Sequence, residues 1–413
     1  MFSLWNSLSA GVRRFAMTEA LLGIGIGLFS LVLNYHLLSM HLNEKQIGEI
    51  TSVSSIITGL ISLPIGLLTD RWGAKNVMVC GIGLMGIGYF LFAGGDTLPL
   101  FYSAQIITSI GITLLVNSEI QLLFSYTASK QEEGTAYSVL FSVFTLFTGV
   151  GTLLGGWLPQ WLDGEGRYVG TLVFAGALLL LLAVLRWALL PARPPVISSE
   201  KPSGAKLSIK LQMAAMYKGT SWKLAVFSLL VGTSLMLVTP YLNLMIKERN
   251  HWSESATSIL LTINGLMLFA GSSAAPMLTR KLGVRRTFGL LFPLNLLAAV
   301  LLGLQLPVLL FSLLLPLRGG LFTLLNNLVE SESMSAVPEA DRNRFAGMRT
   351  VSRSIGSSAA VYVTGALLAS GHTRLPFLLS ALVLLAAYVY FYRTVLPVYE
   401  QTEQTSPLKS ASD

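Results

Sequence analysis

The sequence predicts an all-α membrane protein whose transmembrane helices fall into two tandem halves. Hydrophobic residues make up 53% of the 413 residues, charged residues only 12%, and the mean hydropathy is +0.66. Ordinary soluble domains are about 25% charged, so a soluble globular enzyme does not fit this composition. Twelve apolar runs approach or exceed the roughly 20 residues that a bilayer-spanning helix needs. A charged loop motif also recurs at a spacing of 210 residues.

The twelve runs divide evenly between the halves. They cover 16–40, 47–69, 76–95, 99–125, 135–158 and 168–190, then 222–247, 255–279, 286–304, 307–334, 345–369 and 374–397. We therefore expect an N-terminal six-helix bundle (1–190), a cytoplasmic linker (191–220), a C-terminal six-helix bundle (221–397) and a disordered cytoplasmic tail (398–413). The lysine-containing end of the linker fits either a helix on the membrane surface or a solvated basic segment.

The basic residues are distributed unequally across the predicted membrane. Because the number of helices is even, both termini lie on one side. That side holds 21 of the 28 Lys and Arg residues, Arg186 among them, and the other side holds five. Loops rich in Lys and Arg face the cytoplasm, so both termini are predicted to be cytoplasmic. The expected location is the plasma membrane, which in a bacterium is the inner membrane. No nucleic acid is expected as a partner.

The repeated motif lies in the loops that follow the second and eighth runs. Its two copies comprise Gly66, Asp70, Arg71, Gly73 and Lys75, and then Arg280, Lys281, Gly283 and Arg285. Glycine near a helix end lets another helix approach closely, and an acid can lie against a positive helix N-terminus. For a single copy, the alternative interpretation is that a short loop between two helices simply requires glycine and charged residues. Recurrence at half the chain length favours two related halves.

This pattern resembles the loop between the second and third helices of the major facilitator superfamily of membrane transporters. Ala74 stands where that family usually has a basic residue. The resemblance, to bacterial efflux-type members, covers about residues 15–397. It implies two pseudo-symmetric six-helix bundles around a central cavity and a secondary transporter that works by alternating access. It implies neither an enzyme nor a cofactor, and the motif residues would form an inner gate.

A glycine-rich stretch in the fifth run bears on the direction of transport. Gly151, Gly155 and Gly156 resemble the antiporter signature of this superfamily, with Thr152 in place of a proline. Helix packing alone is the alternative. The signature favours proton-coupled export. The small number of acids near the middle of the runs and the deep Arg318 favour a small neutral or anionic amphipathic solute, and a monomer in the lipid bilayer is expected. An uptake symporter, an anionic-lipid flippase, or a membrane sensor or scaffold without transport are the other possibilities.

Ionisable residues inside the apolar runs mark candidate sites, because burying them in lipid is costly. Arg318 lies deep in the tenth run and would either bind a substrate carboxylate or phosphate or clamp backbone carbonyls or Asn295. The carboxylates and their candidate partners are Glu119, Glu330, Glu332, Arg349 and Arg353. They would exchange protons or close a gate by salt bridges. The gate is favoured for Glu330 and Glu332, whereas Glu119 could join Asp70 and Arg71.

Polar side chains on the cavity-facing runs complete the predicted site. They are Asn34, Tyr35, Asn117, Tyr241, Asn243, Arg318, Asn326 and Asn327. Asn and Tyr inside a bundle form interhelical hydrogen bonds, and contact with substrate is the equal alternative. The chain has one cysteine, Cys80, and no ligand-spaced metal cluster or phosphate-binding loop. Neither a metal site nor an ATP-driven pump is therefore predicted.

Overall fold

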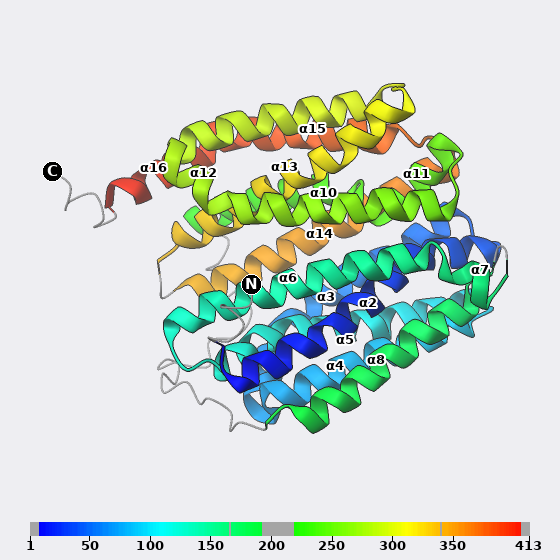
Figure 1. Cartoon of the computed structure of the whole chain (residues 1–413). Coiled ribbons are helices and arrows are strands. Elements are labelled where there is room, and N and C mark those ends of the chain that lie inside the picture. Colours follow the sequence, from blue (N-terminus) through cyan, green and yellow to red (C-terminus); the bar gives the residue numbers. More distant parts are fainter. Residues whose placement is uncertain (1–7, 165–166, 192–218, 339–340, 406–413) are drawn as a thin grey trace. The chain divides into compact units, whose positions relative to one another are not determined.

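The computed structural model describes residues 8–164, 167–191, 219–338 and 341–405, which form helices joined by short loops and contain no strand (Figure 1). The first half contains α2 (Ala10–Ser39), α3 (Glu44–Trp72), α4 (Ala74–Ala93), α5 (Leu98–Ser125), α6 (Lys130–Gly155), α7 (Leu158–Leu162) and α8 (Val169–Leu189). The second contains α10 (Thr220–Met236), η1 (Thr239–Tyr241), α11 (Leu242–Asn250), α12 (Glu254–Gly303), α13 (Val308–Ser335), α14 (Arg342–Ala369), α15 (Leu375–Tyr390), η3 (Phe391–Val395) and α16 (Leu396–Thr405).

The helices follow the predicted apolar runs, so the all-α prediction is confirmed. Ten helical segments of the described residues are long and apolar enough to cross a membrane. The second and eleventh predicted runs correspond to α3 and α14, which have sufficient length but carry more polar residues. The seventh run is interrupted by the 3₁₀ turn η1 at Pro240. Most of the predicted linker, residues 192–218, lies outside the described residues.

The chain forms two compact units that differ from the predicted halves in one segment. Unit 1 comprises Met1–Ile197 together with Tyr241–Leu266, and unit 2 comprises Ser198–Pro240 together with Met267–Asp413. The segment Tyr241–Leu266 comes from the second half of the sequence but packs with the first half. In unit 1, α2 packs closely on α6 and α8, and α4 packs on α5 and α8.

The core of unit 2 is rich in aromatic side chains. Phe227, Phe288, Phe292, Phe391 and Tyr399 are all buried and contact one another through their rings. Such rings contribute large buried areas and preferred packing geometries. Tyr399 explains a correction to the prediction: the tail was expected to be disordered from residue 398, but α16 continues to Thr405 because Tyr399 anchors it in this core. Residues 406–413 lie outside the described part.

The two predicted motif loops share one unusual backbone conformation. Gly73, between α3 and α4, has φ 78° and ψ 143°, and Gly283, the single non-helical residue inside α12, has φ 73° and ψ 163°. This region of backbone space is almost restricted to glycine. The sequence repeat therefore corresponds to a structural repeat in which a glycine breaks the helix at the same motif position.

We expect Gly73→Ala to destabilise the protein by about 1–3 kcal/mol through backbone strain. A Cβ atom at residue 73 would meet no neighbour within 4 Å, so steric overlap does not contribute. Gly83→Ala is the matched control, since Gly83 is helical and equally unobstructed. Thermal unfolding of the purified protein should show a lower midpoint for Gly73→Ala only. Equal midpoints for the two variants would contradict the strain.

Candidate functional site

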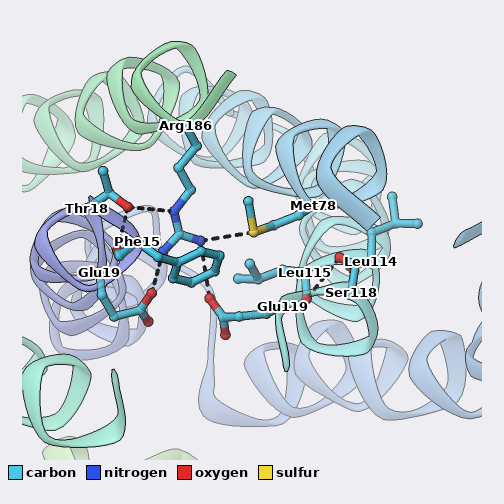
Figure 2. Close-up of polar contacts among 9 residues, drawn as sticks. All are labelled: Phe15, Thr18, Glu19, Met78, Leu114, Leu115, Ser118, Glu119 and Arg186. Atoms are coloured by element: carbon cyan, nitrogen blue, oxygen red, sulfur yellow. Dashed lines mark hydrogen bonds and ion pairs between the residues drawn. The ribbon is translucent and has the colours of Figure 1, made fainter. Parts of the chain in front are cut away.

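A buried ion cluster joins three helices of unit 1. The guanidinium of Arg186, on α8, lies between the carboxylates of Glu19 on α2 and Glu119 on α5 (Figure 2). Arg186 Nη2 pairs with Glu19 Oε2, and Nη1 lies 3.2 Å from Glu119 Oε1. The Arg186 and Glu19 side chains are 0% and 1% exposed, whereas Glu119 is 15% exposed. Glu119 is therefore the carboxylate that solvent can reach.

The remaining faces of the guanidinium are also occupied. Arg186 Nε donates to Thr18 Oγ1 at 3.2 Å, and Nη1 lies 3.3 Å from Met78 Sδ. The Phe15 ring centroid lies 4.6 Å from Arg186 Cζ, a cation–π distance. With both acids ionised the cluster carries one excess negative charge, and with one proton it is neutral. Because charges interact more strongly away from water, the gain or loss of a single proton changes both the net charge of this cluster and the strength of its ion pairs.

This cluster corrects one expectation and contains one residue that the sequence reasoning missed. Glu119 was expected to exchange protons, to form a gate salt bridge or to join Asp70 and Arg71; its ion pair is with Arg186, and the Asp70 side chain lies outside the described residues. Arg186 was counted among the cytoplasmic surface cations, but it is buried between helices. Glu19 was not singled out. An acid inside the first apolar run and a base inside the sixth were the available signals.

Arg318 occupies a buried position in unit 2. Its Nη2 donates to Ser380 Oγ of α15 at 2.7 Å, and the same hydroxyl donates to the Ser234 carbonyl of α10 at 2.8 Å. The Phe322 ring centroid lies 5.4 Å from Arg318 Cζ. Arg318 Nε has no hydrogen-bond partner, and Asn295 instead donates to the Leu321 carbonyl. The interhelical contact thus runs through a serine hydroxyl and not through Asn295.

The predicted gate residues of unit 2 lie on α13 and α14. Arg349 Nη2 donates to Glu330 Oε1 at 2.5 Å, as the salt-bridge interpretation expected. Glu330 is 46% exposed and Arg349 is 15% exposed, so the pair lies at a solvent boundary. Arg353, one turn further along α14, packs its side chain against Gly232 of α10. Glu332 is half-exposed on the same helix as Glu330.

The predicted cavity asparagines of α5 and α13 make local contacts. Asn117 Nδ2 donates to the Thr113 carbonyl at 2.8 Å within α5. Asn327 Nδ2 donates to Ser272 Oγ of α12 at 2.8 Å, and Asn326 is half-buried beside it. Asn327 therefore links two helices of unit 2, whereas Asn117 satisfies its own helix.

The polar residues of α2 and α11 contact each other directly. Asn34 Nδ2 donates to Asn243 Oδ1 at 2.9 Å, and Tyr35 OH donates to the Asn243 carbonyl at 3.1 Å. Asn243 Nδ2 donates in turn to the Leu31 carbonyl at 2.8 Å. Tyr241 is buried next to them. Of the two alternatives for these residues, interhelical hydrogen bonding is the one that the contacts display.

A second polar group lies beside these asparagines, within unit 1. Lys247 Nζ is 2.8 Å from Glu254 Oε1 and 4.6 Å from the Tyr35 ring centroid. Tyr168 OH also donates to Glu254. The segment Tyr241–Leu266 is thus held to unit 1 by polar contacts.

One of the motif residues contacts the end of a neighbouring helix. Lys75 Nζ donates to the Leu190 carbonyl at 2.6 Å, at the C-terminal end of α8, where a cation is favourable. Arg285 lies 3.7 Å from Glu400, and both are exposed. Arg71 and Lys281 are exposed at the same motif positions. Gly66, Asp70 and Arg280 belong to helices, but their side chains lie outside the described residues.

The glycines of α6 serve close helix contacts. A Cβ at Gly151 would overlap the backbone of Ile24 on α2, and one at Gly156 would overlap Ser258 of α12. A Cβ at Gly155 would lie 3.1 Å from Leu31 Cδ2, which is closer than an ordinary contact. The packing alternative therefore accounts for all three, because small residues let helix backbones meet.

Comparisons with known proteins agree with this architecture. A family model described as Major Facilitator Superfamily matches residues 15–333 and 224–412. The chain is 22% identical over 253 residues to the Quinolone resistance protein NorA of Staphylococcus aureus (strain MSSA476), covering 60% of this chain and 61% of that protein. It is 25% identical over 196 residues to Multidrug resistance protein 1 of Bacillus subtilis (strain 168), covering 47% and 48%. Both matches span less than two thirds of the relative.

Solved structures match over most of the chain. The nucleoside transporter NupG superimposes with a TM-score of 0.72 at 16% identity, covering 92% of this chain and 99% of that one. A bacterial homologue of the human lysosomal transporter Spinster superimposes with a TM-score of 0.75 at 13% identity, covering 95% and 97%. At these identities the likeness shows the fold alone, and it confirms the predicted twelve-helix architecture.

We expect Arg186→Ala to destabilise the protein by about 3–5 kcal/mol, because it leaves two carboxylates without their buried cation. The triple variant Arg186→Met, Glu19→Gln, Glu119→Gln should recover most of this loss, since it removes all three charges. Thermal unfolding midpoints of the purified variants test this. Arg14→Ala, at an exposed basic residue, is the control. A triple variant no more stable than Arg186→Ala would contradict the electrostatic origin.

Proposed function

Because the chain belongs to the Major Facilitator Superfamily of transporters, we propose that it couples proton movement to the export of a small neutral or anionic amphipathic solute. In this proposal it works by alternating access, with both termini in the cytoplasm. The ion cluster of Arg186, Glu19 and Glu119 is the observation that carries the proposal.

The chemistry of the cluster suits a proton-coupling site. One guanidinium between two carboxylates is electrically neutral only when the cluster also holds one proton. Glu119 is 15% exposed and can exchange that proton with solvent, whereas Glu19 is 1% exposed and holds Arg186 in place. Protonation of Glu119 would weaken its attraction to Arg186 and so loosen α5 from α8. A proton can thereby change the contact between two helices of unit 1.

Relatives support the direction of transport. The names of NorA and Multidrug resistance protein 1 describe resistance proteins, and removal of a compound from the cell is one basis for resistance. The predicted antiporter signature is weaker support, because Gly151, Gly155 and Gly156 are accounted for by packing. The unequal distribution of Lys and Arg along the chain supports the proposed orientation.

Arg318 supports the anionic class of solute. It is 5% exposed, and its Nε has no partner among the described residues. Its hydrogen-bond partner is a neutral hydroxyl, so its charge is not neutralised by that contact. A carboxylate or phosphate on the solute would neutralise it. Because α13 corresponds to a cavity-facing helix in the family resemblance, Arg318 is the proposed contact for an acidic group.

We expect Glu119→Gln to abolish solute-driven proton movement in proteoliposomes, because an amide cannot exchange the proton. Downhill solute transport should persist, since the amide still accepts a hydrogen bond from Arg186. Asp96→Asn, which removes an exposed carboxylate between α4 and α5, is the control and should leave both signals intact.

Other results of the proteoliposome assays would distinguish the alternative functions of the protein. Unchanged proton movement in Glu119→Gln would overturn the coupling role of the cluster. Solute accumulation in the direction opposite to export would indicate an uptake symporter. Movement of a labelled anionic lipid without any solute signal would indicate a flippase. Absence of all transport by folded wild-type protein would favour a sensor or scaffold.

Arg318→Gln should selectively reduce transport of anionic solutes in the same proteoliposomes, because it removes the cation while keeping a hydrogen-bond donor for Ser380. Arg318→Lys should retain part of that transport. Neutral solutes and the thermal unfolding midpoint should change little in Arg318→Gln. Equal loss for neutral and anionic solutes would assign Arg318 to interhelical packing.

A further inference from the structure

A groove on unit 2 lies apart from the residues discussed above. It has a volume of about 560 Å³ and runs between α10 and the segment formed by α15 and η3. This volume is within the range of roughly 300–1,000 Å³ that is typical of sites for small molecules. Its lining includes Leu230, Leu382, Ala386, Val389, Arg393 and Thr394.

The long wall of the groove is apolar and faces outward. Leu382, Leu385 and Val389 are 62%, 42% and 43% exposed, and they recur at helical spacing within the membrane-spanning segment Leu375–Gln401. Large apolar side chains that are exposed on such a segment contact the hydrocarbon of the bilayer. An acyl chain is therefore the natural neighbour of this wall.

One end of the groove is cationic. Arg393 and Thr394 are consecutive residues of the π-helical turn η3, and both line the groove. Turns of this kind are frequent at functional sites. Arg393 is exposed and has no ion pair among the residues that the structure describes, whereas nearby Glu400 pairs with Arg285.

A second cation lies toward the same end. Lys223, in the first turn of α10, is exposed and precedes Leu230 by seven residues, which places both on one helix face. Leu230 lines the groove. An apolar groove that ends near two cations matches a molecule with a long hydrocarbon chain and an anionic headgroup.

We propose that this groove binds an anionic phospholipid of the surrounding bilayer. One acyl chain lies along Leu382, Ala386 and Val389, and the phosphate group accepts hydrogen bonds from Arg393. A transmembrane helix from another protein would fill the apolar wall but leave Arg393 unneutralised, so charge complementarity favours the lipid. The site is independent of the proposed transport function, because binding needs no solute or proton gradient.

Native mass spectrometry of the full-length chain in detergent tests the site. Titration with phosphatidylglycerol and with phosphatidylcholine of identical acyl chains should show preferential binding of phosphatidylglycerol. Arg393→Gln should weaken phosphatidylglycerol binding about fivefold, the change expected for one Arg near an anionic headgroup, without changing phosphatidylcholine binding. Ala386→Trp, which fills the groove from an exposed position, should weaken binding of both lipids.

Arg14→Gln is the matched control, because Arg14 is an exposed cation near one end of α2. It should leave both lipid affinities unchanged. Equal affinity of the wild-type protein for the two lipids would overturn the proposal, as would an equal effect of Arg14→Gln and Arg393→Gln. Unchanged binding in Ala386→Trp would overturn the placement of the acyl chain. Thermal unfolding confirms that each variant is folded before titration.

Discussion

The high energetic cost of charge away from water constrains the interior of unit 1. Arg186 is tolerated there because Glu19, Glu119, Thr18, Met78 and Phe15 surround its guanidinium, so that every face has a partner. The same contacts tie α2, α5 and α8 together at one position. Removing Arg186 would leave two carboxylates without their cation, and removing both acids would leave the guanidinium uncompensated, so the three ionisable groups act as a unit.

The two units stabilise their buried arginines differently. In unit 1 a buried cation is matched by two acids, whereas in unit 2 Arg318 is held by a serine hydroxyl and an aromatic ring. The shared repeat persists in the loops at Gly73 and Gly283. The two loops thus share a backbone conformation while the interiors of the two units differ in charge, one with a cation paired to two acids and the other with a cation held by a hydroxyl and a ring.

The sequence predicted the features that depend on local pattern. Runs of apolar residues located the helices, and the recurrence of glycine located both helix breaks. The pairing of Glu330 with Arg349 was also anticipated, because the two residues belong to adjacent helices. Contacts between distant segments were not predictable: 67 residues separate Glu119 from Arg186. Arg186 was misplaced because its position near a helix end resembles that of a surface cation, and only tertiary packing shows its burial.

The grouping of Tyr241–Leu266 with unit 1 has a mechanical consequence. The chain passes between the units three times, after Ile197, after Pro240 and after Leu266, and not once through a single linker. The second passage lies in the 3₁₀ turn η1 and the third inside the helix α12. Any displacement of one unit against the other must therefore be absorbed by bending or local unwinding at these two places. At these two described passages, helical backbone would transmit force between the units.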